Sequence, residues 1–165
     1  MKAFGIVGWK NAGKTTLVAR LVTEIAARGF AVSTLKHAHA GFDVDREGAD
    51  SWRHREAGAH EVLVASPRRW ALMHEARSGA ETPLTDLLAR LSPVDLVLIE
   101  GWKREGHPKL EVRRAAVPGP LLAASDPSVR AVASDGPVAG LSAPLLPLDD
   151  AAAVADFILR ETGLA

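Results

Sequence analysis

The sequence predicts an α/β fold in which a doubly wound, mainly parallel sheet has helices on both faces and an added antiparallel β-hairpin. Short apolar runs of strand length alternate along the chain with segments of helical periodicity. A glycine-rich loop joins the first apolar run, residues 3–7, to the first helix. Two later runs, 61–65 and 70–73, lie too close together for a parallel crossover and therefore predict the hairpin. The 165 residues are expected to form a single domain, 1–165.

The loop at residues 8–16 has the spacing of a phosphate-binding P-loop, with two glycines followed by a lysine and a hydroxyl residue. Its backbone N–H groups and the positive end of the following helix would surround a phosphate. Lys14 would contact the outer phosphates, and the Thr15 hydroxyl would bind Mg²⁺. The alternative is a glycine-rich turn between a core strand and a core helix. We predict a P-loop NTPase fold whose nucleotide-binding residues are Gly8, Trp9, Lys10, Asn11, Ala12, Gly13, Lys14, Thr15 and Thr16.

Composition restricts the partners that the chain is expected to bind. Lys and Arg together number 20, as do Asp and Glu, so no net field attracts nucleic acid or an anionic membrane. There is no Cys, which excludes disulfides and thiolate metal sites and is compatible with a reducing compartment. No apolar run approaches the ~18 residues of a membrane span. We expect a cytoplasmic protein with no nucleic-acid and no membrane partner.

Turn residues and periodicity divide the chain into its elements. Gly29 and Gly58 fall just past expected helix ends, and Thr82-Pro83 has the chemistry of a helix start. The expected order is helix 14–28, strand 30–35, loop 36–47, short helix 50–57, hairpin 61–75, helix 82–91 and strand 95–100. After these come three short strands and a last helix, at 110–113, 121–124, 129–133 and 149–161.

The apolar run 96–99 ends in a carboxylate, Glu100. A Mg²⁺-nucleotide site needs a carboxylate near the P-loop hydroxyl, and nucleotide-binding sheets place it at the end of a neighbouring apolar strand. We therefore predict that Glu100 joins Thr15 in binding Mg²⁺, directly or through water. The alternative is an acidic residue that only ends a strand.

The loop 36–47 leaves the sheet at the edge where open α/β sheets bind ligands, and it carries His37, His39, Asp43 and Asp45. His37 and His39 are two residues apart, but no Cys and no clear third ligand accompanies them, so contact with phosphates or plain loop polarity is favoured over a metal pair. Asp43 and Asp45 are the catalytic candidates. Near Mg²⁺ they could hold a metal-bound water, and otherwise they belong to a solvated acidic loop.

Blocks of sequence, in one order along almost the whole chain, carry a family resemblance. They are the loop 8–16, Lys36-His37-Ala38-His39, Phe42-Asp43-Val44-Asp45, Gly48-Ala49-Asp50-Ser51, Ala57-Gly58-Ala59, Arg69-Trp70-Ala71-Leu72-Met73, Glu100-Gly101-Trp102-Lys103 and Ala131-Val132-Ala133-Ser134-Asp135. Together they resemble the molybdopterin-guanine dinucleotide biosynthesis protein B (MobB) family. The chain departs from that pattern after His39, where the family often has another His and an acidic residue, and this weakens a metal role for the segment.

The resemblance implies a GTP-binding accessory protein of molybdenum cofactor biosynthesis, in the dimeric, signal-recognition-like branch of P-loop NTPases. It would bind GTP and Mg²⁺, hydrolyse GTP slowly at best, and act as an adaptor for the molybdopterin guanylyltransferase that attaches GMP to molybdopterin. The assignment of GTP as the nucleotide rests on the resemblance, because the usual Asn-Lys-x-Asp element of G proteins is missing. Asp135 could accept hydrogen bonds from the guanine N1–H and amino group, or be a turn residue before Gly136.

The hairpin 61–75 is the expected dimerisation element. Its open edges and apolar side chains suit pairing with a second copy, and the resemblance also implies a homodimer. A helix of the same chain could cover it instead.

Two other functions remain open. A P-loop small-molecule kinase would need an acceptor pocket and a positioned base, and no such pair stands out. A metallochaperone-type GTPase is disfavoured by the absence of Cys and the scattered His.

Overall fold

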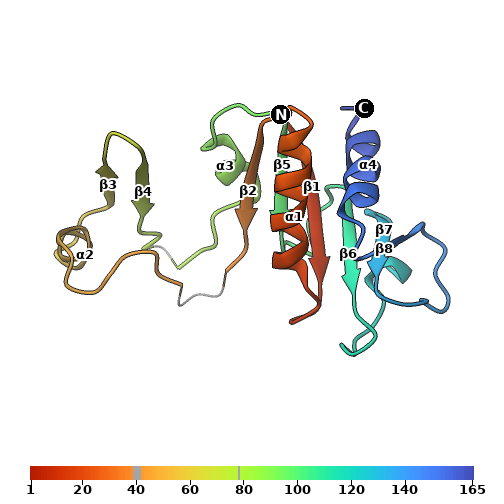
Figure 1. Cartoon of the computed structure of the whole chain (residues 1–165). Coiled ribbons are helices and arrows are strands. Elements are labelled where there is room, and N and C mark those ends of the chain that lie inside the picture. Colours follow the sequence, from red (N-terminus) through yellow and green to blue (C-terminus); the bar gives the residue numbers. More distant parts are fainter. Residues whose placement is uncertain (39–41, 78) are drawn as a thin grey trace. The chain divides into compact units, whose positions relative to one another are not determined.

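The computed structural model describes residues 1–38, 42–77 and 79–165. The chain forms two compact units, which are described separately. Unit 1 comprises Met1–His37 and Leu91–Ala165, and unit 2 comprises Ala38–Arg90 (Figure 1). None of the helices in the described ranges combines the length and the apolar character that a membrane span requires.

Unit 1 is built on a six-stranded sheet in which every pairing is parallel. In spatial order its strands are β2 (Val32–Lys36), β5 (Leu96–Glu100), β1 (Lys2–Gly8), β6 (Lys109–Arg113), β7 (Val129–Ser134) and β8 (Leu145–Pro147). Strands β5 and β6 flank β1, so the strand order changes direction there. Ligands of open α/β sheets bind at such a switch point, outside the carboxyl ends of the strands. These ends form the lower edge of the sheet in Figure 1. The predicted fold class is confirmed.

Two helices cover one face of this sheet. They are α1 (Lys14–Ala27) and α4 (Ala151–Thr162), and they pack against the sheet residues Phe4, Ile6, Leu96, Leu98, Leu110, Val112, Ala131 and Ala133. These residues alternate along their strands, so that each strand sends every second side chain into one apolar core. The Asp150 side chain accepts a hydrogen bond from the Ala153 amide and so fixes the start of α4.

The opposite face carries buried charges. Lys109 is fully buried and donates from Nζ to Asp126 Oδ2 at 3.1 Å and to the carbonyl oxygens of Lys103 and Glu105. Glu111, also fully buried, accepts from Arg113 Nη1 and from the Ala123 amide. Each buried charge is therefore paired, as its burial requires.

The structure corrects several element predictions. Residues 121–124 were expected as a strand, but Leu122–Ala124 form a 3₁₀ helix, η1, because the Ala123 amide donates to the Glu111 side chain. The helix expected from Thr82 is α3 (Leu84–Ala89), whose N-cap is Pro83 and which has no side-chain cap. The second strand begins at Val32 rather than at residue 30. Strand β8 was not predicted, because it has only three residues and ends in proline.

Unit 2 contains α2 (Asp50–Glu56), α3 and the antiparallel hairpin of β3 (Glu61–Ala65) and β4 (Trp70–His74). The predicted hairpin is confirmed. Helix α2 packs on β3, and Val62 is buried there. On the other face Leu63 lies directly opposite Leu72, and these side chains are 60% and 44% exposed. Cross-strand neighbours on one face interact, so they form one apolar patch together with Trp70, which is 66% exposed.

His107 gives unit 1 a testable pH dependence. Both of its ring nitrogens are buried without a hydrogen-bond partner among the described residues, and the ring lies on Gly5, where a Cβ atom would come within 2.5 Å of Nε2. Burial lowers the pKa of His107, and the charge of Lys109 lowers it further. As the pH falls below about 6.5, the unfolded chain takes up this proton before the folded one, so the free energy of unfolding decreases.

We expect urea unfolding at pH 7.5 and 5.5 to show this loss for the wild type and a smaller loss for His107→Leu. The exposed His54 provides a control, since His54→Leu should keep the wild-type difference between the two pH values. Equal losses in wild type and His107→Leu would contradict the assignment.

Candidate functional site

The candidate site is the loop between β1 and α1, at the carboxyl edge of the sheet. Gly8 has φ 147°, and a Cβ atom there would lie 2.5 Å from the Val112 carbonyl oxygen. Gly13 has φ 97° and is the N-cap of α1. Glycine is needed at both ends of the loop, because a side chain at either position would meet strain, and at Gly8 also the neighbouring strand. The sequence folds here into the bent loop that exposes backbone N–H groups to an anion.

Lys14 is the first residue of α1, and its side chain crosses the loop. Its Nζ donates to the Trp9 carbonyl oxygen at 2.8 Å. Burial lowers the pKa of Lys14. Glu100 opposes this shift, while the charges of Lys103 and Lys36 lower the pKa further. Three ammonium groups therefore lie near a single carboxylate, which leaves a local positive charge suited to a polyphosphate.

Thr15 and Glu100 lie together, as the predicted metal site requires. The Thr15 hydroxyl donates to Glu100 Oε1 at 2.8 Å, although the two residues are far apart in the sequence. Glu100 is buried at the end of β5, next to β1 in the sheet. A hydroxyl and a carboxylate oxygen are hard ligands of the kind that Mg²⁺ prefers, so these residues fit the ion. Their binding of Mg²⁺ stays a prediction.

Trp9 attaches the loop to the segment that follows β6. Its Nε1 donates to the Pro120 carbonyl oxygen at 2.9 Å, and a Cβ atom at Gly119 would lie 2.6 Å from the indole ring. Lys103 Nζ lies 3.9 Å from the centroid of the Trp9 ring, in a cation–π contact. The other predicted loop residues divide by exposure: Ala12 is buried, whereas Lys10, Asn11 and Thr16 are exposed.

His37 lies beside the end of β5 in an aromatic stack. Its ring is 4.7 Å from that of Trp102, and its amide donates to the Glu100 carbonyl oxygen. Gly101, with φ 105°, leaves room for this stack, because a Cβ atom there would lie 2.7 Å from His37 Cβ. The structure thus gives His37 a packing role. His39 lies outside the described residues.

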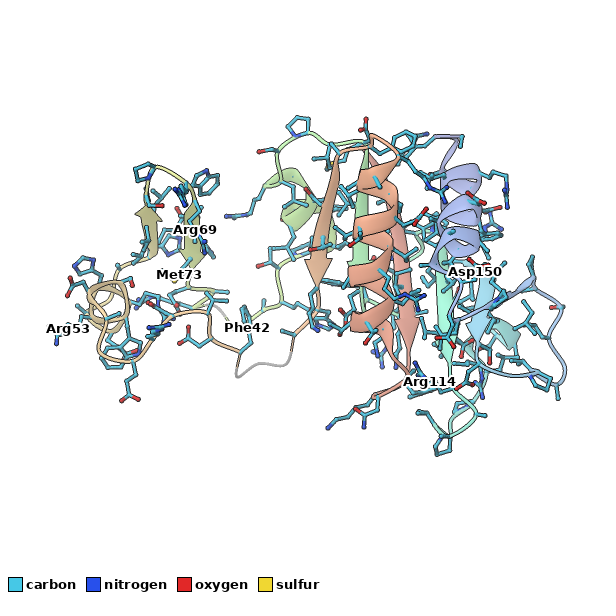
Figure 2. The ribbon with its side chains drawn as sticks, viewed as in Figure 1. Phe42, Arg53, Arg69, Met73, Arg114 and Asp150 are labelled. Atoms are coloured by element: carbon cyan, nitrogen blue, oxygen red, sulfur yellow. The ribbon has the colours of Figure 1, made fainter. Side chains whose placement is uncertain are left out.

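Asp135 holds the segment that follows β6. Its Oδ1 accepts from the Ala115 amide at 2.8 Å, and its Oδ2 forms an ion pair with Arg114 Nη1 at 3.7 Å. Arg114 in turn lies beside the P-loop, since a Cβ atom at Gly13 would be 3.1 Å from Arg114 Nε. Figure 2 shows Arg114 at the same lower edge of the sheet. Both carboxylate oxygens of Asp135 therefore have partners within the chain, and its guanine contact stays a prediction.

The catalytic candidates belong to unit 2, where they surround one arginine. Arg55 pairs with Asp43 Oδ2 at 2.8 Å, with Asp45 Oδ2 at 3.4 Å and with Glu75 Oε1 at 2.9 Å. A hydrogen bond from the Asp45 amide, followed by the bond from Arg55, lowers the pKa of Asp43. No cluster of His, Asp and Glu arranged to hold a metal ion occurs in the described part of the chain. A catalytic role for either aspartate stays a prediction.

The structure brings three further cations to the site, Lys36, Lys103 and Arg114, for which the sequence motifs predict no role. They share one signal: each is at or just after the end of a strand in the parallel sheet, namely β2, β5 and β6. Cationic residues at such positions collect at the ligand-binding edge of an α/β sheet.

Comparison with known proteins agrees with this geometry. The sequence model of the family described as molybdopterin guanine dinucleotide synthesis protein B, MobB, matches residues 3–135. The chain belongs to this family. The resemblance found in the sequence is thereby confirmed.

Two relatives match over most of their own length. The molybdopterin-guanine dinucleotide biosynthesis adapter protein of Escherichia coli (strain K12) is 41% identical over 155 residues, covering 92% of this chain and 88% of that protein. The adapter protein of Haemophilus influenzae is 39% identical over 154 residues, covering 93% and 85%. The crystal structure of a MobB protein homolog from Bacillus stearothermophilus has a TM-score of 0.74 at 28% identity and covers 100% of both chains.

Proposed function

We propose that this chain is a GTP-binding adapter protein of molybdenum cofactor biosynthesis, and that it assists the attachment of GMP to molybdopterin. The adapter role is supported by the two curated relatives, which carry that name and match nearly the whole chain. The nucleotide role is supported by the P-loop, where Lys14, Thr15 and Glu100 lie within one small region. The partner in this proposal is a molybdopterin guanylyltransferase, and the cytoplasmic location remains a prediction.

The charges at the loop would favour phosphate binding. The N–H groups of the loop and the start of α1 would bind the inner phosphates, and Lys14 would leave the Trp9 carbonyl oxygen for the outer ones. Thr15 and Glu100 would hold Mg²⁺, which neutralises phosphate charge when bound. Arg114 lies beside Gly13 and would add a further cation. In this proposal Asp135 contributes to guanine recognition or fixes the segment that carries Arg114.

Slow hydrolysis at most is expected. A general base needs a pKa near the working pH, but the pKa of Asp43 is lowered below its ordinary acidic value, which makes it a poorer base. Asp45 accepts hydrogen bonds from the Arg46 amide and the Ser51 hydroxyl besides its contact with Arg55. These aspartates therefore suit a protein that binds GTP more than one that consumes it rapidly.

The decisive experiment is a titration with GTP and with ATP, each with and without Mg²⁺, followed by a multiple-turnover assay. The proposal predicts tighter binding of GTP than of ATP, enhancement by Mg²⁺ and little turnover. Rapid transfer of phosphate to an added small-molecule acceptor would instead favour a kinase. Failure to bind either nucleotide would refute the proposal.

The metal ligands can be tested separately. We expect Thr15→Ala and Glu100→Gln to weaken GTP binding more in Mg²⁺ than in EDTA, because both side chains are proposed to act through the ion. The loss in Mg²⁺ should be roughly tenfold, the size of one interaction with a charged group. Calorimetric titration under the two conditions measures it. Equal losses with and without Mg²⁺ would show that the residues act by another route.

A further inference from the structure

Lys36 makes a contact that the proposed function does not yet use. It ends β2 and is the register partner of Glu100 on β5. Its Nζ lies 3.1 Å from Glu100 Oε1 and 3.1 Å from Thr15 Oγ1, and these two oxygens are themselves 2.8 Å apart. The ammonium group of Lys36 and the two oxygens thus form a closed triangle.

The two oxygens in this triangle are those proposed to bind Mg²⁺. The ion needs oxygen ligands at about 2.0–2.1 Å in near-octahedral geometry, which leaves no room for an ammonium group on the same atoms. Two cations at such a short distance from each other would also repel each other strongly. Mg²⁺ and the Lys36 ammonium are therefore alternatives at this position.

The exposure of the side chains indicates that Lys36, and not Glu100, moves when Mg²⁺ binds. The Glu100 side chain is 11% exposed and is held at the end of its strand, whereas the Lys36 side chain is 54% exposed. A lysine head group lies on a flexible four-carbon chain, so it can turn away while the two oxygens stay in place. Once displaced, it would remain within the group of cations around Lys14, where it can contact phosphate oxygens.

Resting on the proposed function, we propose that the Lys36 ammonium group occupies the Mg²⁺ position in the ion-free protein. It lies against the Thr15 hydroxyl and the Glu100 carboxylate in place of the ion. Mg²⁺ displaces the Lys36 ammonium group on binding, and this ammonium group then contacts the phosphates. Lys36 thus sets the Mg²⁺ concentration at which the site changes its cation.

The test is Lys36→Met, which keeps the length of the side chain and removes its charge. Two readouts are used: binding of fluorescent GTP during a Mg²⁺ titration that starts in EDTA, and thermal unfolding of the nucleotide-free protein over the same Mg²⁺ range. We expect the Mg²⁺ midpoint to fall about tenfold in both, the size of one hydrogen bond to a charged group, because the competing ammonium group is gone.

Lys103→Met is the control that distinguishes the direct contact of Lys36 with the two oxygens from the general effect of removing a nearby positive charge. Lys103 also lowers the pKa of Lys14, but its ammonium lies over the Trp9 ring. We expect a clearly smaller midpoint shift for Lys103→Met than for Lys36→Met. Equal shifts in the two variants, or an unchanged or raised midpoint in Lys36→Met, would overturn it. The melting experiment needs no nucleotide, so it decides the inference even if wild-type protein binds no GTP and the proposed function fails.

Discussion

Replacing Lys14 by alanine is expected to abolish nucleotide binding while leaving the chain folded. The Lys14 ammonium is proposed to contact oxygens of the outer phosphates, and each hydrogen bond to a charged group contributes about 1.5–3 kcal/mol. Loss of two such bonds corresponds to a decrease in affinity of at least ~100-fold. The fold should survive, because among the described residues the side chain donates one hydrogen bond, to the Trp9 carbonyl oxygen, and is not part of the apolar core.

Calorimetric titration with GTP and thermal unfolding together test this prediction. Lys2→Ala is the matched control, since Lys2 is an exposed lysine at the other end of β1 and its loss should change neither measurement. An unchanged GTP affinity in Lys14→Ala would remove residues 8–16 from consideration as the nucleotide site. A large drop in melting temperature would show instead that the side chain is structural.

The second large effect is expected on assembly, where Leu72→Arg should convert a homodimer into monomers. We propose that two copies pair through the hairpin 61–75, because its open edges and the patch of Leu63, Leu72 and Trp70 are exposed in the single chain. Leu72 is paired with Leu63 at the middle of this patch. An arginine there would place an unpaired charge in the buried interface, which is strongly unfavourable.

Sedimentation velocity at micromolar concentration measures the result. Leu145→Arg is a matched control, because Leu145 is 45% exposed, nearly the same as Leu72, but belongs to β8 in unit 1. The proposal requires a dimer for the wild type and for Leu145→Arg, and a monomer or an aggregate for Leu72→Arg. A well-behaved wild-type monomer would refute the dimer.

Local sequence was sufficient wherever chemistry and spacing act over a few residues. The spacing of Gly8 and Gly13 predicted a bent glycine-rich loop, and the structure has φ of 147° and 97° there. The apolar run before Glu100 predicted β5, which is buried throughout. The separation of 61–65 from 70–73 predicted the hairpin, because so short a connection permits only antiparallel pairing.

Local sequence was insufficient where a side chain replaces a backbone partner. The run 121–124 was suited to a strand. The buried Glu111 carboxylate, however, accepts a hydrogen bond from the Ala123 amide, and the segment forms the 3₁₀ helix η1. Asp135 was proposed to contact a guanine base, and the structure adds that both of its oxygens hold residues 114 and 115. Such partners are not neighbours in the sequence, so the hydrophobic periodicity of a segment does not reveal them.

The P-loop, the acidic end of β5 and the family of the chain could be identified from the sequence, because each depends on residue identity and short spacing. Which charges meet at that loop depends on how the whole chain folds. Parallel pairing sets the ends of β2, β5 and β6 along one edge beside β1, and this brings Lys36, Glu100 and Arg114 to a loop that precedes all of them in the chain. Strand order is fixed by packing of the whole sheet, so the cations that share the site with Lys14 follow from the fold and not from the motif.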